Sequence, residues 1–278
     1  MDLNRTILWS ATLGNAPLDA RVMAAADTGY RSLSLLPFDG GWAKENGKQP
    51  GELKRWAADL GIEFSIMDGF ADWYPHPPPK RSTIPPIGLE DFMAMAVAFE
   101  VDSVSAVSAF PTDVGIDTVT EGFAQFCDRV ALEGMVVELE FTPIQPVNSV
   151  GLAHQVVRDS GRTNAAIVFD IWHFYQGNPD FEALEAVPPG IITKSQVSDG
   201  RQGEFMEGLV KDTFMHRMLP GQGNFDFERV LRILDRLGAL DACGPEVLST
   251  DLFAMTPTDA AAAAAKAYDE LAERMRDS

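Results

Sequence analysis

The sequence predicts an α/β protein built as a single (β/α)8 barrel, and three observations favour this fold class. Short segments rich in Val, Ile, Leu and Phe alternate along the whole chain with longer segments of helical periodicity. The eight repeats in 278 residues average about 35 residues each, which is the size of one βα unit. Such alternation implies a parallel sheet, and eight units imply that the sheet closes into a TIM barrel.

Most of the predicted strands are rich in Val, Ile, Phe or Leu and are bounded by Gly, Pro, Asp or Asn, as buried strands should be. The eight strands are expected at residues 7–13, 30–36, 62–68, 101–107, 135–141, 165–171, 190–197 and 245–249. Helical segments between them end at a glycine, which commonly stops a helix; clear examples are 18–29, 121–134 and 225–238. The tail from Pro257 contains six consecutive alanines and is expected to form the closing helix.

The main alternative is an open, doubly wound sheet. That fold would normally carry a glycine-rich phosphate loop after the first strand, whereas the first loop here reads Gly14-Asn15-Ala16-Pro17. No linker or change of composition divides the chain, so we expect one domain over residues 1–278. Two long connections, 69–88 and 198–224, are expected at the carboxyl ends of the strands, where barrel enzymes carry their chemistry.

The net charge and the composition limit the kinds of molecule that this protein is expected to bind. The chain has 22 Lys+Arg and 41 Asp+Glu, a formal net charge of −19, and nucleic acid and anionic membranes both select for basic surfaces. We therefore expect a small-molecule substrate, with neither nucleic acid nor a membrane as partner. The sequence shows no apolar run long enough for a membrane span and no secretion-signal pattern. With only two cysteines, a reducing cytoplasm is the expected compartment.

Oxygen-bearing side chains occur near the carboxyl ends of four consecutive predicted strands. They are Glu140, Asp170, Gln196 and Glu246. Isolated carboxylates inside a barrel are costly to keep charged, and a shared divalent cation removes most of that cost. Three carboxylates and one amide oxygen suit Mg²⁺, Mn²⁺ or Co²⁺. The pattern predicts one divalent metal ion held by these four side chains, although any one acidic residue at such a position is more often a helix cap or a loop residue.

Two further charged residues precede these expected ligands. Glu138 lies two residues before Glu140, and Lys194 lies two residues before Gln196, so each points to the same side of its strand as the ligand that follows. Strands five and seven contribute to the same layer of a barrel interior. We therefore predict a buried interaction between Glu138 and Lys194 beneath the metal, the alternative being that one of them lies at a rim.

The motifs around these residues resemble a known family. The segments VELEF, FDIWH, QVSDG, HRMLPGQGNFDFERVLRIL and GPEVLS are similar to those of the xylose isomerase-like TIM barrels of the sugar phosphate isomerase/epimerase type. The resemblance implies a divalent metal bound by the acidic residues that end strands five, six and eight, together with a histidine on strand seven. Gln196 stands where that histidine is usual. Members of this family are often oligomers, so a homo-oligomer is consistent with the resemblance.

The resemblance also implies an activity. It indicates a metal-dependent isomerase or epimerase that acts on a sugar-like polyhydroxy carbonyl compound by proton abstraction through a metal-stabilised enediolate. Glu140 and Glu246 would move the proton while also touching the metal. His173 is expected to act in catalysis, the alternative being that it only orients a carboxylate.

Three other residues are candidates for substrate binding, each with a simpler alternative. Arg217 can bind a substrate oxygen or carboxylate with two N–H groups, or it can form a salt bridge within its loop. Trp9 can contact the substrate or fill the barrel. Asp199 can orient a ligand or cap the loop that follows strand seven.

Other functions remain open. Gln196 is similar to the 3-dehydroshikimate dehydratase branch of the superfamily, which predicts a metal-dependent lyase, but Thr142 stands where that branch has a histidine. DNA repair of the endonuclease IV type, which shares the barrel, is disfavoured by four histidines and a charge of −19. A binding barrel without catalysis is disfavoured by the three acidic residues.

Overall fold

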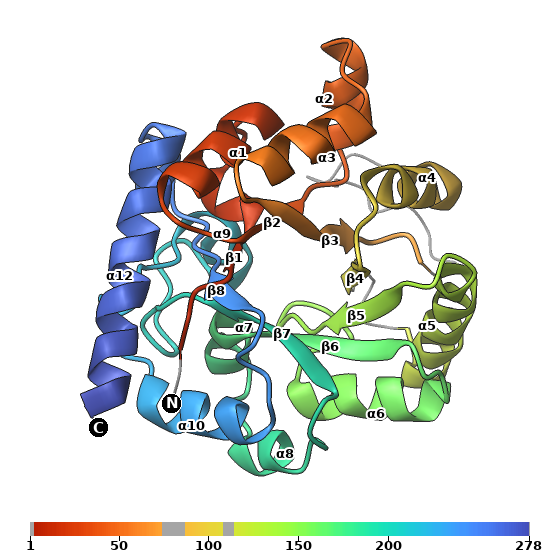
Figure 1. Ribbon diagram of the computed structural model, residues 1–278. Helices are drawn as coiled ribbons and strands as arrows, with labels where there is room; N and C mark the ends of the chain where they lie inside the picture. Colours follow the sequence, from red (N-terminus) through yellow and green to blue (C-terminus); the bar gives the residue numbers. More distant parts are fainter. Residues whose placement is uncertain (1–2, 74–86, 108–113, 278) are drawn as a thin grey trace.

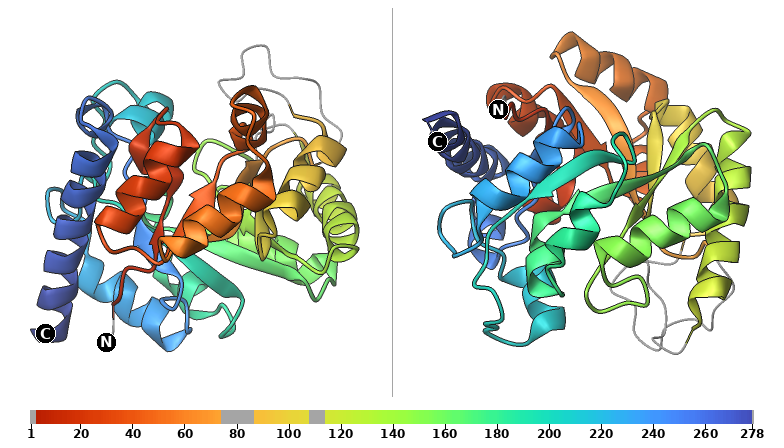
Figure 2. Two further views of the ribbon diagram at one scale, coloured as in Figure 1. Left: turned by 45° about the horizontal axis from the view of Figure 1, so that its top comes forward. Right: turned by 90° about the horizontal axis from the view of Figure 1, so that it is seen from below.

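The computed structural model describes residues 3–73, 87–107 and 114–277, and it confirms the predicted barrel (Figure 1). One sheet contains eight parallel strands in chain order. The strands are β1 (Ile7–Leu8), β2 (Ser32–Leu35), β3 (Glu63–Phe70), β4 (Ser103–Val107), β5 (Val136–Glu140), β6 (Ala165–Asp170), β7 (Ile192–Val197) and β8 (Cys243–Pro245). Helices surround the strands in both further views (Figure 2).

The helices between the strands vary widely in length. The main ones are α1 (Leu18–Asp27), α2 (Asp39–Glu45), α3 (Pro50–Asp59), α4 (Leu89–Phe99), α5 (Ile116–Ala131), α6 (Val150–Ser160) and α10 (Phe227–Arg236). Shorter ones are η1 (Ser10–Leu13), α7 (Ile171–Gln176), α8 (Phe181–Glu185), α9 (Leu209–Met215) and α11 (Thr250–Phe253). The closing helix α12 (Pro257–Asp277) lies beside α1 and buries part of its alanine face. No helix in the described part of the chain is long and apolar enough to cross a membrane.

The barrel closes where β1 meets β8. The backbone N–H of Thr6 donates to the Cys243 carbonyl at 2.8 Å, and the Cys243 N–H donates to Thr6 Oγ1 at 3.0 Å. Gly244 permits this approach, because a Cβ atom at this position would lie 1.8 Å from the carbonyl oxygen of Ile7. The missing side chain thus lets the last strand pack against the first.

We expect Gly244→Ala to destabilise the protein by about 2 kcal/mol or more, because added volume in a packed site forces backbone movement. Equilibrium urea unfolding measures the change. Gly41→Ala is the matched control, since Gly41 lies in α2 with open space where a Cβ atom would stand, and alanine is the better helix residue. An unfolding free energy for Gly244→Ala equal to that of wild type would contradict this account of the seam.

The first and last strands are shorter than predicted. The chain leaves β1 after Leu8 and forms η1, where the Ser10 N–H donates to Ser34 Oγ at 2.9 Å. The last strand begins at Cys243, before the predicted start, and ends at Pro245. Beyond it the Val247 N–H donates to Thr12 Oγ1 of η1 at 3.0 Å, so side-chain bonds to η1 replace the strand ladder.

The two predicted long connections have different outcomes. Most of 69–88 lies outside the described residues, while its start continues β3 to Phe70. The connection 198–224 contains α9 and is held by two isolated antiparallel bridges, Asp199 to Met218 and His216 to Ser249. These bridges bring Arg217 back toward the end of β8.

Side chains along each strand point alternately toward the helices and toward the barrel interior, and these two sides differ in polarity. On β5, Val137 and Leu139 join the apolar layer between barrel and helices, whereas Glu138 and Glu140 are buried without joining it. A small apolar cluster of Ile7, Trp9, Ile66 and Val168 lies apart from that layer and draws on β1, β3 and β6. The barrel interior is therefore apolar in one part and strongly acidic in another.

Candidate active site

Strand ends position the four predicted ligands. Glu140 ends β5, Asp170 ends β6, Gln196 lies one residue before the end of β7 and Glu246 directly follows β8. Asp170 and Gln196 are register partners across β6 and β7. All four side chains are buried. Because parallel strands end at one rim of a barrel, the closed sheet alone brings these residues to a common region.

His173 joins Glu140 and Asp170 at one point. One ligand atom from each of the three lies within 4.8 Å of the other two. His173 Nε2 is 3.4 Å from Glu140 Oε1 and 3.4 Å from Asp170 Oδ2. Asp170 Oδ1 accepts the backbone N–H of Trp172 at 2.7 Å and so caps α7, which begins immediately after β6. This cap leaves Oδ2 directed toward His173 and places the imidazole beside the carboxylates.

Arg217 bridges two of the carboxylates. Its Nη1 donates to Asp170 Oδ2 at 2.7 Å and to Glu246 Oε2 at 3.0 Å, and its Nη2 is 3.4 Å from His173 Nε2. The guanidinium is fixed from behind by the Thr213 carbonyl, which accepts from Nε at 2.9 Å, and by the face of the Trp172 ring. Arg217 therefore lies inside the site.

Burial and charge shift the acid–base properties of these groups. Burial raises the pKa of Glu140 well above its usual value, and the negative charges of Asp68 and Asp170 add to this effect. Burial likewise raises the pKa of Glu246, although Arg217 opposes the change. Burial also acts to raise the pKa of Asp170, but Arg217 and His173 outweigh it and hold that pKa below its usual value. Burial lowers the pKa of His173 to about 4, so its imidazole is neutral at pH 7.

The donor set fits a divalent cation. Gln196 is fully buried, and neither its Oε1 nor its Nε2 has a hydrogen-bond partner among the described residues. A buried amide without partners is costly, and a cation would satisfy its oxygen. Carboxylate oxygens, one amide oxygen and a neutral imidazole together suit Mg²⁺, Mn²⁺, Co²⁺ or zinc.

Asp68 is a site residue that the sequence analysis did not identify. It lies near the end of β3 with 7% of its surface exposed, and Ser105 Oγ of β4 donates to its Oδ1 at 2.5 Å. Burial raises its pKa to about 6, and the charges of Glu138 and Asp170 act in the same direction. The signal was present in the sequence, because Asp68 is the last residue of a predicted strand.

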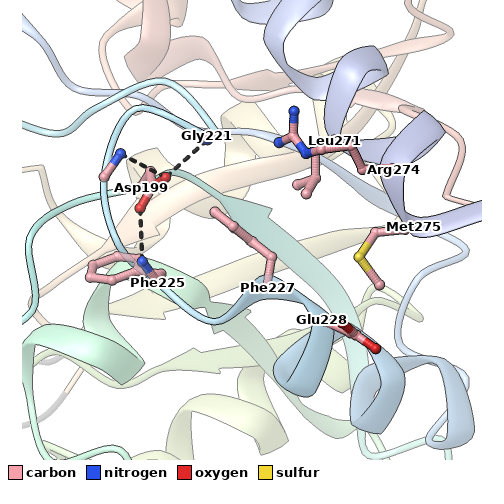
Figure 3. A pocket seen from close by; sticks show the side chains of 9 residues that line it. Asp199, Gly221, Phe225, Phe227, Glu228, Leu271, Arg274 and Met275 are labelled. Atoms are coloured by element: carbon pink, nitrogen blue, oxygen red, sulfur yellow. Dashed lines mark hydrogen bonds between the residues drawn. The ribbon is translucent and has the colours of Figure 1, made fainter. Parts of the chain in front are cut away.

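Asp199 holds the loop after β7 (Figure 3). Its carboxylate accepts the backbone N–H groups of Gly200 at 2.8 Å, Gly221 and Gly223 at 2.9 Å, and Phe225 at 3.3 Å. Both oxygens are therefore committed to the chain, which favours the loop-capping alternative over ligand binding. The pocket of about 340 Å³ beside it is also lined by Phe227 and by residues near the end of α12, which are Leu271, Arg274 and Met275.

Two other predictions concern the barrel interior. The predicted ion pair is confirmed: the Lys194 ammonium contacts the fully buried Glu138 and also lies 3.1 Å from Ser103 Oγ. Trp9 packs with Ile7 and the other interior apolar residues, as in the barrel-filling alternative. Its indole N–H is nevertheless buried without a hydrogen-bond partner among the described residues.

Comparison with known proteins now identifies the family. The sequence model of the xylose isomerase-like TIM barrels matches residues 22–277. The chain belongs to this family. The chain is also similar to curated inosose isomerases, with 27% identity over 153 residues to the one from Bacillus subtilis and 28% over 138 residues to the one from Bacillus velezensis. These matches cover 54% and 49% of this chain and 52% and 48% of the relatives, so the matched region spans about half of each.

Solved structures share the xylose isomerase-like fold over almost the whole chain. A crystal structure of the IolI protein with a bound zinc atom superposes with a TM-score of 0.82 at 18% identity, covering 98% of this chain and 99% of that one. An L-ribulose 3-epimerase gives a TM-score of 0.69 at 16% identity, with coverage of 98% and 96%. A probable 3-DHS dehydratase from Bacillus anthracis gives 0.72 at 11% identity, with coverage of 95% and 98%. At these identities the likeness concerns the fold.

Proposed function

We propose that this xylose isomerase-like protein is a metal-dependent isomerase or epimerase of polyhydroxy carbonyl compounds, with an inosose as the first candidate substrate. The proposal depends mainly on one observation: ligand atoms of Glu140, Asp170 and a neutral His173 lie close to one another. The buried Gln196 amide, which has no hydrogen-bond partner among the described residues, supports it. The inosose isomerase relatives and the zinc bound by the IolI protein support this proposal.

Glu140, Asp170 and His173 have ligand atoms close enough to one another to hold the cation. Gln196 and the Glu246 carboxylate, which contacts Arg217, would complete its ligands. A bound divalent cation acts as a Lewis acid toward a carbonyl oxygen and makes the neighbouring C–H more acidic. Burial raises the pKa values of Glu140 and Glu246, so each carboxylate is a stronger base than an exposed glutamate and can accept and return a proton. Glu140 ends β5 and Glu246 directly follows β8, so the two carboxyls reach the interior from different parts of the barrel.

The remaining site residues would bind the substrate or orient the catalytic groups. The Arg217 guanidinium holds Glu246 and presents N–H groups to a substrate oxygen. His173 Nδ1 has no hydrogen-bond partner among the described residues and can exchange a hydrogen bond with a substrate hydroxyl. The free indole N–H of Trp9 is a candidate substrate donor, whereas Asp199 contributes indirectly by holding the loop that leads to Arg217.

Exchange of a substrate proton for solvent deuterium tests the proposal. An inosose, L-ribulose and 3-dehydroshikimate would each be incubated in D₂O with Mg²⁺, Mn²⁺, Co²⁺ or Zn²⁺ and followed by proton NMR. We expect exchange beside the carbonyl of the inosose or the ketose and its loss on chelation. Failure of both to exchange with every metal would contradict the proposal.

A dehydratase is the second candidate, favoured by Gln196 and by the fold shared with the probable 3-DHS dehydratase. Within the described part of the interior, however, both cations already contact carboxylates: Arg217 pairs with Asp170 and Glu246, and Lys194 with Glu138. A substrate carboxylate would find no unpaired Lys or Arg side chain there. Loss of water from 3-dehydroshikimate in the same panel, without exchange in the other two compounds, would favour the dehydratase.

Metal affinity is expected to rise with pH. The raised pKa values of Glu140 and Glu246 mean that the metal-free protein holds protons that a cation must displace. His173, with a pKa near 4, is already neutral above about pH 5 and adds little to this competition. Calorimetric titration with Mn²⁺ at pH 5 to 8, in buffers of different ionisation enthalpy, measures both the affinity and the protons released. An affinity independent of pH would contradict the assignment of these carboxylates as ligands.

A further inference from the structure

We propose that Asp68, supported by Ser105, is a substrate-positioning residue that accepts a hydrogen bond from a substrate hydroxyl that the cation does not bind. The inference rests on the proposed function, because it places a polyhydroxy ligand in the same interior. It adds a contact point on β3 and β4, whereas the predicted ligands come from β5 to β8.

The closed sheet places Asp68 across the barrel from Gln196. β3 and β7 are four strands apart in either direction around the ring, because β8 and β1 are neighbours. A ligand that contacts both residues is therefore held from two opposite strands of the barrel. A six-membered ring or a short sugar chain, with hydroxyls along its length, offers hydrogen-bonding groups to both.

Local packing fixes the Asp68 carboxylate on Ser105. The register of β3 with β4 shifts between Met67 and Phe70, so Asp68 lies at the irregularity. At Gly69 a Cβ atom would lie 2.3 Å from Val107 Cγ2, so only glycine allows β3 to lie this close to β4. Ser105 is the register partner of Glu138 on β5, which places the pair on the acidic inner surface.

Asp68 differs from the other buried carboxylates of the interior in its partners. Glu138 contacts Lys194, Arg217 pairs with Asp170 and Glu246, and Glu140 lies against His173. Of these partners, Lys194 and Arg217 are cationic side chains, whereas His173 is neutral at pH 7. No cation lies within 4.0 Å of the Asp68 carboxylate among the described residues, and the Ser105 hydroxyl donates only to Oδ1.

The second oxygen of this carboxylate is thus available for a ligand donor. A buried carboxylate is costly without hydrogen-bond donors, and a substrate hydroxyl would supply one. A phosphate or carboxylate group of a substrate would instead be repelled by Asp68 and by the other acidic residues around it. Asp68 therefore favours an uncharged polyol over an anionic substrate at this end of the interior.

Binding of deoxy analogues tests the role of Asp68 independently of turnover. The Mn²⁺-loaded protein would be titrated calorimetrically with an inosose and with monodeoxy inososes that each lack one hydroxyl away from the carbonyl. We expect wild type to lose about 10- to 100-fold in affinity for one deoxy compound, as for a hydrogen bond to a charged group. In Asp68→Ala this discrimination should fall below about threefold, and Ser105→Ala should weaken it partially.

The control is Asp102→Ala, which removes an exposed aspartate beside the start of β4 and should leave the discrimination unchanged. Unchanged Mn²⁺ affinity and a cooperative unfolding transition show that a variant remains folded. If Asp68→Ala does not fold, the affinities of wild type for the deoxy compounds and the partial effect of Ser105→Ala still test the inference. Equal affinity of wild type for every compound, absence of inosose binding, or full discrimination by Asp68→Ala would each overturn the inference. Discrimination without metal-dependent exchange would contradict the proposed function alone.

Discussion

The Glu140→Gln and Glu246→Gln variants are each expected to lose at least about 10³-fold in the rate of solvent deuterium exchange. Each substitution keeps the shape of the side chain and removes both a metal-binding charge and a group that can carry a proton, and general acid–base catalysis alone contributes about 10²- to 10⁴-fold. Burial gives both carboxyls a raised pKa suited to this role. The exchange rate of the responding substrate at saturating Mn²⁺ measures the effect.

Metal loss and proton transfer are separated by titrating Mn²⁺ into each variant. A variant that still binds Mn²⁺ at the working concentration, yet exchanges slowly, has lost the proton carrier. Glu133→Gln is the control, because Glu133 forms a partly exposed i,i+4 pair with Arg129 on the outside of the barrel. Exchange within tenfold of wild type in both site variants would rule out these glutamates as the proton carriers.

The Lys194→Met variant is expected to lose about 3–5 kcal/mol of unfolding free energy at pH 7, because it leaves the buried charge of Glu138 without its cation. Glu138 is fully buried, and its Oε2 already lacks a hydrogen-bond partner among the described residues. Urea unfolding of the metal-free protein measures the loss.

The double variant Glu138→Leu/Lys194→Met should recover most of this stability, since apolar residues of similar size often replace a buried pair at little cost. Arg129→Met breaks the surface pairs with Glu90 and Glu133 and should cost much less than Lys194→Met, because exposed ion pairs contribute little to stability. If Lys194→Met proved as mild as Arg129→Met, the Glu138–Lys194 contact would not be an important part of the interior.

Much of the site was predictable because strand direction and alternation are local properties. The residues Glu140, Asp170, Gln196 and Glu246 were found by locating where each strand ends, and the Glu138–Lys194 pair by counting back two residues. The limits of β1 and β8 were not predictable, because side chains of η1 and β2 replace ladder bonds there. Asp68 was not predicted, because it ends the third strand and the expected ligands lie on the last four.

The sequence by itself determined the order of strands and helices, the closed parallel barrel and the strand ends that carry acidic residues, since these follow from periodicity and spacing along the chain. Only the tertiary structure decided which groups share the interior. The positions of Arg217 between two carboxylates, of His173 beside Glu140 and of Asp68 on Ser105 depend on contacts between distant segments. The same contacts set the pKa values, because burial and neighbouring charge exist only in the folded chain.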